Sequence, residues 1–288
     1  MPELPEVETV RRSLAQSLTG ARIEFVQTRR AGLRFPFPRD FRERLRGVRI
    51  LSFARRAKYL LVALDSGDTL VSHLGMSGSF RIEDVVQGDF LHPRSKDPKH
   101  DHVIFCLEGG KTLTYNDPRR FGFLALEKSL SLESAPVLKG LGIEPLSAEF
   151  GPARLASLFA GSRLSLKVGL LDQRRIAGLG NIYACESLWR AKLLPSRPAG
   201  SLTDAVGKPT QAAKALAPAI RDVLDEAIKA GGSTLRDHRQ PDGDLGYFQH
   251  SFAVYDREGQ SCPRVCGGII LRTVQSNRSS FWCPMCQT

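Results

Sequence analysis

The sequence predicts an α+β protein of two lobes, with an N-terminal β-sandwich or barrel preceded by a helix and a helical C-terminal lobe. Three observations lead to this fold class. Short β-type runs fill the chain up to residue 116, helical patterns follow between 151 and 229, and most of the cysteines gather at 252–288. The length of 288 residues is sufficient for two domains.

Apolar residues recur at spacings of three and four from Val7 to Leu18, so we expect a helix over 5–18 that begins just after Pro5. Gly, Pro and Asp separate the short runs that follow, which is typical of an all-β sandwich or barrel. The strands are expected at 21–27, 48–54, 58–65, 68–73, 102–108 and 112–116. The charged, proline-containing stretch 85–101 is expected to be a surface loop.

The second half of the chain has a helical period. Helices are expected at 151–160, 165–172, 181–192 and 209–229, with Pro209 in the first turn of the last one and Gly231 at its end. The glycine-rich segment 231–250 is expected to be mobile. We therefore predict domains at 1–134, 150–236 and 250–288.

The formal net charge of +11 is typical of a protein that binds a polyanion, although ribosome-associated and other basic proteins share it. No apolar run approaches the roughly 18 residues that a membrane span needs. The acidic start lacks the basic and apolar regions of a secretory signal. We expect a cytoplasmic protein with nucleic acid as its partner.

Four cysteines, Cys262, Cys266, Cys283 and Cys286, form two close pairs joined by sixteen residues. Two such pairs on a hairpin supply four ligands for tetrahedral Zn²⁺, and two disulfides are the alternative. Four thiolates leave no open position, so this zinc would be structural. We expect strands at 269–274 and 281–282 with a turn at 275–280. Arg278, near that turn, could hold a phosphate or simply be solvated.

The amino terminus offers a candidate nucleophile. Proline at position 2 favours removal of Met1, which leaves a secondary amine, and an α-amino group has a pKa of about 8. A neutral amine can attack a carbonyl or a sugar C1′ and form an iminium. Glu3 and Glu6 lie beside it at the start of the helix. Acidic residues at an ordinary helix start are the alternative interpretation.

The chain resembles bacterial formamidopyrimidine-DNA glycosylase, the family also called 8-oxoguanine DNA glycosylase/AP lyase. Seven blocks occur in the family's order and, with the cysteine hairpin, cover nearly the whole chain. They are residues 1–12 (MPELPEVETVRR), 55–60 (RRAKYL), 73–78 (HLGMSG), 116–122 (NDPRRFG), 171–173 (LDQ), 177–183 (AGLGNIY) and 246–252 (GYFQHSF).

The resemblance implies a β-sandwich lobe, a helix–two-turn–helix lobe and a zinc hairpin, with DNA between the lobes. It makes Pro2 the Schiff-base nucleophile and Glu3 the acid/base that assists base loss. Lys58 is then the proton donor that assists the lyase step. The resemblance also places Arg278 in this catalytic set, as a residue that binds a phosphate of the DNA.

The resemblance also implies a set of DNA-binding residues. Met76, Arg119 and Phe121 would fill the gap left in the duplex, as an apolar wedge, an arginine for the widowed cytosine and an aromatic that stacks. Without the resemblance, Met76 and Phe121 would be taken for core residues. The other implied DNA contacts are His73, His100, Arg163, Lys167, Gly178 and Asn181. The segment 231–250 would close over a flipped base.

We therefore expect a monomeric base excision repair enzyme that excises oxidised purines from duplex DNA and nicks the strand by β,δ-elimination. One structural Zn²⁺ is expected and no other cofactor. The alternatives are a sister glycosylase for oxidised pyrimidines and a non-catalytic zinc protein that binds nucleic acid. One departure from the family is the three-residue gap between Cys262 and Cys266, where two residues are usual. Zinc is still expected there, with an altered turn geometry and reduced affinity.

Overall fold

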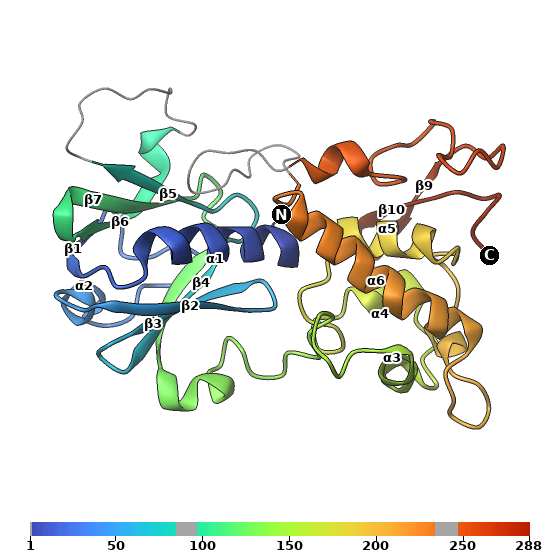
Figure 1. Ribbon diagram of the computed structural model, residues 1–288, viewed down its shortest axis with the longest axis horizontal. Coiled ribbons are helices and arrows are strands. Elements are labelled where there is room, and N and C mark those ends of the chain that lie inside the picture. Colours follow the sequence, from blue (N-terminus) through green and yellow to red (C-terminus); the bar gives the residue numbers. More distant parts are fainter. Residues whose placement is uncertain (1, 85–96, 234–246) are drawn as a thin grey trace. The chain divides into compact units, whose positions relative to one another are not determined.

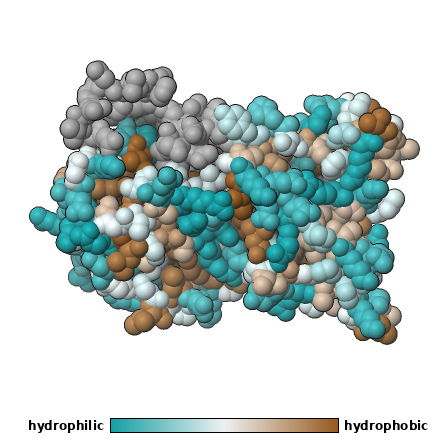
Figure 2. Space-filling model, viewed as in Figure 1, coloured by the Kyte–Doolittle hydropathy of each residue, from teal (hydrophilic) through white to brown (hydrophobic). Residues whose placement is uncertain are grey.

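The computed structural model describes residues 2–84, 97–233 and 247–288, and it divides into two compact units (Figure 1). Unit 1 comprises Met1–Lys139 and Ala230–Tyr247, and unit 2 comprises Gly140–Lys229 and Phe248–Thr288. On the face drawn in Figure 2, hydrophilic side chains cover most of both units. Within the described ranges, none of the helices combines the length and the apolarity that crossing a membrane would require.

Among its described residues, unit 1 contains one long and one short α-helix, short 3₁₀ helices and two antiparallel sheets. Its elements are α1 (Leu4–Leu18), β1 (Ile23–Thr28), α2 (Phe41–Leu45), β2 (Ile50–Arg56), β3 (Tyr59–Leu64), β4 (Asp68–His73), β5 (Ser79–Asp84), η1 (Pro98–His100), β6 (Asp101–Leu107), η2 (Glu108–Gly110), β7 (Lys111–Asn116), β8 (Phe123–Lys128) and η3 (Ser129–Ser134). One sheet has the strand order β1-β6-β7-β5 and the other has the order β2-β3-β4-β8.

The two sheets enclose one apolar core, and Figure 1 shows α1 running between them. The core contains Leu14 from α1, Phe53 and Val62 from one sheet, and Phe105 and Tyr115 from the other. The apolar face of α1 is the one that the sequence period predicts, because Val7, Val10, Leu14 and Leu18 are all buried there. A helix embedded in this way holds its N-terminal residues in a fixed position relative to both sheets.

Two short crossovers join the sheets at one edge of the sandwich. Residues 74–78 lead from β4 to β5, and residues 117–122 lead back from β7 to β8. His73 pairs with Phe123 at one end of these crossovers, and Ser79 pairs with Asn116 at the other. Because both crossovers begin and end at paired residues, they lie side by side.

Unit 2 is helical and ends in a hairpin. Its elements are α3 (Pro152–Phe159), α4 (Leu166–Leu170), α5 (Asn181–Arg190), η4 (Ala199–Leu202), α6 (Gln211–Lys229), η5 (Phe248–Ser251), β9 (Leu271–Gln275) and β10 (Arg278–Trp282). The apolar faces of α3, α5 and α6 are buried, as their periodicity predicts. Arg190 on α5 also forms a two-pronged ion pair with Glu226 on α6, at 2.6 and 2.7 Å.

The α+β fold with a β-sandwich, a helical region and a cysteine hairpin is confirmed, and several local predictions are corrected. Strands β5 and β8 were not expected. The sequence of β8, FLALEK, has a helical composition, but pairing with β4 decides its structure. Pro209 lies outside α6, which begins at Gln211. The hairpin turn is narrower than 275–280, because only Ser276 and Asn277 separate β9 from β10.

Two predicted segments fall largely outside the described residues. The loop expected at 85–101 is described only from residue 97, where η1 and then β6 follow. The lid expected at 231–250 is described only at 231–233 and 247–250.

Candidate functional site

Pro2 and Glu3 directly precede α1, and both residues are buried. The Glu3 N–H donates to Glu6 Oε2 at 2.8 Å, which fixes the first turn of the helix. Glu6 Oε1 accepts hydrogen bonds from Ser233 N at 2.8 Å and Ser233 Oγ at 2.9 Å. The chain therefore places two buried carboxylates immediately after the proline, at the helix end where the dipole stabilises negative charge.

Lys58 lies in the two-residue turn between β2 and β3, and only 7% of it is exposed. Ala57 makes this turn possible by adopting a left-handed conformation with φ of 53°. Arg55 donates to Ala57 O at 3.0 Å and to Glu8 Oε2 at 3.4 Å. Burial acts to raise the pKa of Glu8, but the guanidinium of Arg11 and its neighbours lower it. The turn that carries Lys58 is thus bonded to the helix that begins after Glu3.

His73 ends β4 beside the first crossover. Its ring stacks on Phe123, with centroids 5.7 Å apart, and its Nδ1 accepts the Gly75 N–H at 3.0 Å. Burial lowers the pKa of His73 to about 4, and the positive charges of Lys58 and Arg34 act in the same direction. The imidazole is therefore neutral at neutral pH, with Nε2–H as its remaining donor.

Met76, Arg119 and Phe121 project from the two crossovers. Met76 is 37% exposed and Phe121 is 47% exposed, which excludes the core role that composition alone would favour. The Arg119 guanidinium carbon lies 4.8 Å from the centre of the Phe121 ring. An exposed thioether, an aromatic ring and a guanidinium on one edge suit contact with nucleobases.

In unit 2, two side chains converge on the backbone at the start of β10. Asn181, the first residue of α5, donates from Nδ2 to Ser279 O at 2.9 Å, and Lys167 Nζ lies 3.4 Å from the same oxygen. Lys167 is fully buried, so its ammonium would have to move to reach a phosphate. These contacts hold the strand at the residue next to Arg278.

The remaining predicted phosphate contacts differ in their setting. Arg163 and Arg278 are exposed, and neither forms an ion pair with any residue that the structure describes. Gly178 has φ of 96° and donates its N–H to Gln173 Oε1 at 2.9 Å. His100 is half-buried in η1, and its carbonyl accepts the Asp117 N–H at 3.1 Å.

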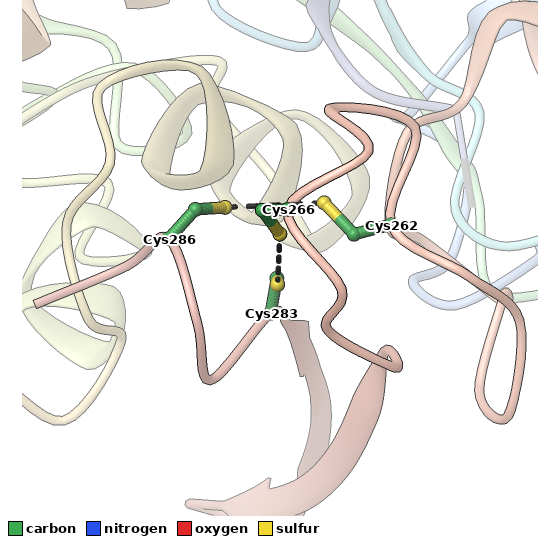
Figure 3. Close-up of side chains that lie close together, drawn as sticks. All are labelled: Cys262, Cys266, Cys283 and Cys286. Carbon is green, nitrogen blue, oxygen red and sulfur yellow. Dashed lines mark hydrogen bonds between the residues drawn. The ribbon is translucent and has the colours of Figure 1, made fainter.

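The four cysteines of the hairpin converge (Figure 3). All four sulfurs lie within 4.8 Å of one another, with Cys266 and Cys283 at 3.5 Å and Cys262 and Cys286 at 3.9 Å. A disulfide requires about 2.05 Å, whereas the edges of a Zn–S₄ tetrahedron with bonds of about 2.3 Å measure about 3.8 Å. The donor set therefore fits zinc. Gly268 is needed beside it, because a Cβ there would lie 2.6 Å from Cys283 Sγ.

The three-residue gap between Cys262 and Cys266, which we call the first knuckle, is one residue longer than is usual in the family, but the four sulfurs still lie close together. Val265 takes φ of 55° and is almost fully exposed, and this lets Arg264 turn back over the cluster. Arg264 donates to Cys286 Sγ at 3.7 Å and to Arg190 O at 2.8 Å, and it lies 4.2 Å from the centre of the Trp189 ring. Trp189 Nε1 donates to Cys262 Sγ at 3.5 Å.

A buried carboxylate joins α5 to the segment that leads into the hairpin. Glu186 accepts the N–H groups of Ala253 at 2.9 Å, Val254 at 3.0 Å and Tyr255 at 2.8 Å. Burial raises the pKa of Glu186, while these three bonds act to lower it. Three backbone donors on one carboxylate fix the path of the chain from η5 to the first cysteine.

Four residues that support the site were not among the predicted site residues: Ser77, Asp117, Glu186 and Arg264. A signal was available for Glu186, which interrupts the buried stretch Ile182–Leu188 with a carboxylate. Asp117 lies in the block 116–122, one of the seven that carry the family resemblance, and it precedes Pro118. Its burial could not be inferred from composition.

Three family models match successive parts of the chain. Residues 1–124 match the formamidopyrimidine-DNA glycosylase N-terminal domain, and residues 141–239 match the H2TH domain of the same glycosylase. Residues 259–288 match the zinc finger found in FPG and IleRS. The last match and the sulfur geometry together support a structural zinc, held by the four cysteines.

Curated relatives and solved structures agree with these matches over the whole chain. The chain is 57% identical to formamidopyrimidine-DNA glycosylase from Rhodopseudomonas palustris (strain BisA53), with all of both chains covered. It is 44% identical to the MutM (Fpg) protein of Thermus thermophilus, with a TM-score of 0.84 and coverage of 99% and 98%. Fpg of Lactococcus lactis in complex with DNA containing an abasic site is 31% identical, with a TM-score of 0.85 and 99% of each chain covered. The chain is a member of the formamidopyrimidine-DNA glycosylase family.

Proposed function

We propose that this protein is a base excision repair enzyme that removes oxidised purines from duplex DNA and then cuts the strand. The observation that carries the proposal is Pro2 at the head of α1, directly before the buried carboxylates of Glu3 and Glu6. Removal of Met1 would turn Pro2 into a secondary amine in this position. Family membership over the full chain supports the same activity.

In the proposed reaction, the neutral Pro2 amine attacks C1′ of the damaged nucleotide and the glycosidic C–N bond breaks. Glu3 acts as the general acid/base: it takes the proton that the amine loses and gives a proton to the departing base. The nitrogen lone pair then expels O4′ from C1′, O4′ takes up a proton through Glu3, and the sugar ring opens. The resulting iminium acidifies the C2′ hydrogen. Loss of that proton expels the 3′ phosphate, and a second elimination expels the 5′ phosphate. Lys58, buried in its turn, is proposed as a proton donor for these steps.

We assign DNA binding to side chains of both units. In unit 1 these are His73, Met76, His100, Arg119 and Phe121, and in unit 2 they are Arg163, Lys167, Gly178, Asn181 and Arg278. Zinc takes no part in bond making, because its four thiolates leave no open position, and it supplies the folding energy of the hairpin that carries Arg278.

We further propose that 1–134 is the catalytic domain, 150–236 the DNA-binding helical domain and 250–288 the zinc hairpin. The enzyme is proposed to work as a monomer on chromosomal DNA in the bacterial cytoplasm. This assignment agrees with the net charge of +11, which favours a polyanionic partner.

The test compares Pro2→Gly with the wild type on a duplex containing 8-oxoguanine opposite cytosine. We expect excision and strand cutting to fall by at least about 100-fold, while affinity for the lesion duplex stays within about twofold. Unchanged turnover would remove Pro2 from the mechanism. A wild type that cuts only an oxidised-pyrimidine duplex would identify the sister activity, and one that binds without cutting either duplex would be a non-catalytic DNA-binding protein.

A further inference from the structure

Crossovers 74–78 and 117–122 are joined by a buried polar network. Asp117 Oδ1 accepts the Ser77 hydroxyl at 2.6 Å, and Asp117 Oδ2 accepts the Gly122 N–H at 2.9 Å. The Ser77 oxygen in turn accepts the Arg119 N–H at 3.2 Å. One carboxylate and one hydroxyl therefore connect the crossover of Met76 to the crossover of Arg119 and Phe121.

The backbone of Asp117 is also fully engaged. Its N–H donates to His100 O at 3.1 Å, and its carbonyl accepts from His102 Nε2 at 2.9 Å and from Arg120 N at 3.2 Å. Asp117 has no exposed surface, and Ser77 is only 4% exposed. A buried carboxylate whose oxygens and backbone are all bonded holds one geometry, because any other leaves polar atoms unpaired.

Close backbone packing adds a second restraint to the same pair of crossovers. A Cβ on Gly75 would overlap the Phe121 backbone, and a Cβ on Gly122 would overlap the Tyr115 hydroxyl. That hydroxyl donates to His73 O at 3.4 Å. The two glycines thus allow the crossovers to touch, and the network above fixes how they touch.

The residues above this network are exposed. Met76, Phe121 and Arg119 lie on the surface, whereas the Ser77 and Asp117 side chains beneath them are buried. We propose that Ser77 and Asp117 are positioning residues, which set Met76, Arg119 and Phe121 in their duplex-filling arrangement before DNA binds. This inference rests on the proposed function. It predicts that the network serves base extrusion from an intact stack and not the chemistry at Pro2.

The physical gain is preorganisation. Extruding a base leaves a gap and an unpaired cytosine, and three side chains must enter together to compensate. If the crossovers were free to move, ordering them would subtract from the binding free energy at that step. The network removes that cost in the free protein, because the crossovers are already fixed to each other.

The experiment measures single-turnover excision of 8-oxoguanine from two duplexes. In the first, the lesion faces cytosine. In the second, it faces a tetrahydrofuran abasic analogue, so no cytosine has to be held and the stack is already weakened. The variants are Ser77→Ala and Asp117→Asn. The control is Ser72→Ala, which removes another fully buried hydroxyl of unit 1, one that forms no hydrogen bond with the described residues.

We expect Ser77→Ala and Asp117→Asn to lose about tenfold on the first duplex and less than about twofold on the second, with Ser72→Ala unchanged on both. Fluorescence of 2-aminopurine placed beside the lesion should show a matching delay in unstacking. Equal losses on both duplexes, or no loss on either, would overturn the positioning role. A wild type inactive on both duplexes would instead contradict the proposed function.

Discussion

The β-sandwich of unit 1 and the C-terminal hairpin of unit 2 differ in how they hold the exposed side chains that we assign to DNA binding. In unit 1, Met76, Arg119 and Phe121 lie on crossovers fixed by a shared apolar core and by the buried carboxylate of Asp117. In the hairpin, every side chain of β9 from Leu271 to Val274 is exposed. The apolar side chains that the hairpin buries are few: Ile270 and Phe281 pack with Val254 in a small cluster that includes Cys262 and Cys283.

This difference shows where each part obtains its stability. A large apolar core can position side chains without a metal, because burial of its residues supplies the folding energy. A short two-stranded hairpin is marginal by itself, so the four cysteines and their metal must supply that energy. We therefore expect damage to the hairpin to weaken DNA binding through Arg278 while the β-sandwich stays folded.

The largest effect is expected from Cys283→Ser. Structural zinc contributes about 10 kcal/mol or more to the folding of such sites, so the variant should lose zinc and about 100-fold in duplex affinity. Zinc content by mass spectrometry and a binding titration at fixed salt measure both. Cys106→Ser, on β6 of unit 1, is the matched control and should keep both. Full affinity in a zinc-free variant would contradict the role given to the hairpin.

A smaller but still large effect is expected from Glu186→Gln. The amide keeps one acceptor oxygen for the backbone donors of 253–255, and its NH₂ group faces donors, so the unfolding free energy should fall by about 3 kcal/mol. Denaturant titration measures this. Glu226→Gln removes an ion pair whose carboxylate is half exposed, and should cost less than about 1 kcal/mol. Equal losses of unfolding free energy in the two variants would contradict the role of Glu186 in holding residues 253–255.

Arg264→Ala tests whether the longer knuckle is compensated by contacts around the sulfurs. The variant loses the donor to Cys286 Sγ and the guanidinium that lies over the Trp189 ring. Zinc transfer to a chelator should therefore become about tenfold faster. Arg257→Ala is the control, because the Arg257 side chain donates to Phe252 O and Gln260 Oε1 and forms no hydrogen bond with a cysteine among the described residues. Identical release rates for the two variants would assign Arg264 no part in holding the metal.

The smallest effect concerns His73 and pH. The folded pKa of about 4 lies below the ordinary value of 6.5, so between these values the unfolded chain binds a proton that the folded chain does not. The unfolding free energy should therefore rise with pH across that window. His73→Phe keeps a ring on Phe123 and removes the titration, so its slope should be flatter. A His73→Phe slope as steep as the wild type's would contradict this.

Much of the fold could be predicted from the sequence because its signals are local. The buried face of α1 follows from the spacing of Val7 to Leu18, and the zinc site follows from the cysteine spacing. The strand β8 could not be predicted, because FLALEK becomes a strand only through pairing with β4. The positions of side chains that depend on contacts distant in sequence were equally inaccessible.

The same division applies to the candidate site. The cysteine cluster could be predicted from its spacing. Pro2 and Glu3 were chosen through the resemblance to the glycosylase family, and their roles stay a prediction. Asp117 and Ser77 are 40 residues apart, and only the pairing of β5 with β7 and of β4 with β8 brings them together. Lys167 was predicted as a phosphate contact, and its complete burial depends on packing that the sequence does not display.

The Schiff base on Pro2 is tested most directly by borohydride trapping of the full-length protein on a duplex with 8-oxoguanine opposite cytosine, followed by mass mapping of the adduct. We expect one reduced adduct on Pro2, in a chain that begins at Pro2. An adduct on a lysine, or no adduct from a protein that lacks Met1 and still binds the duplex tightly, would contradict it.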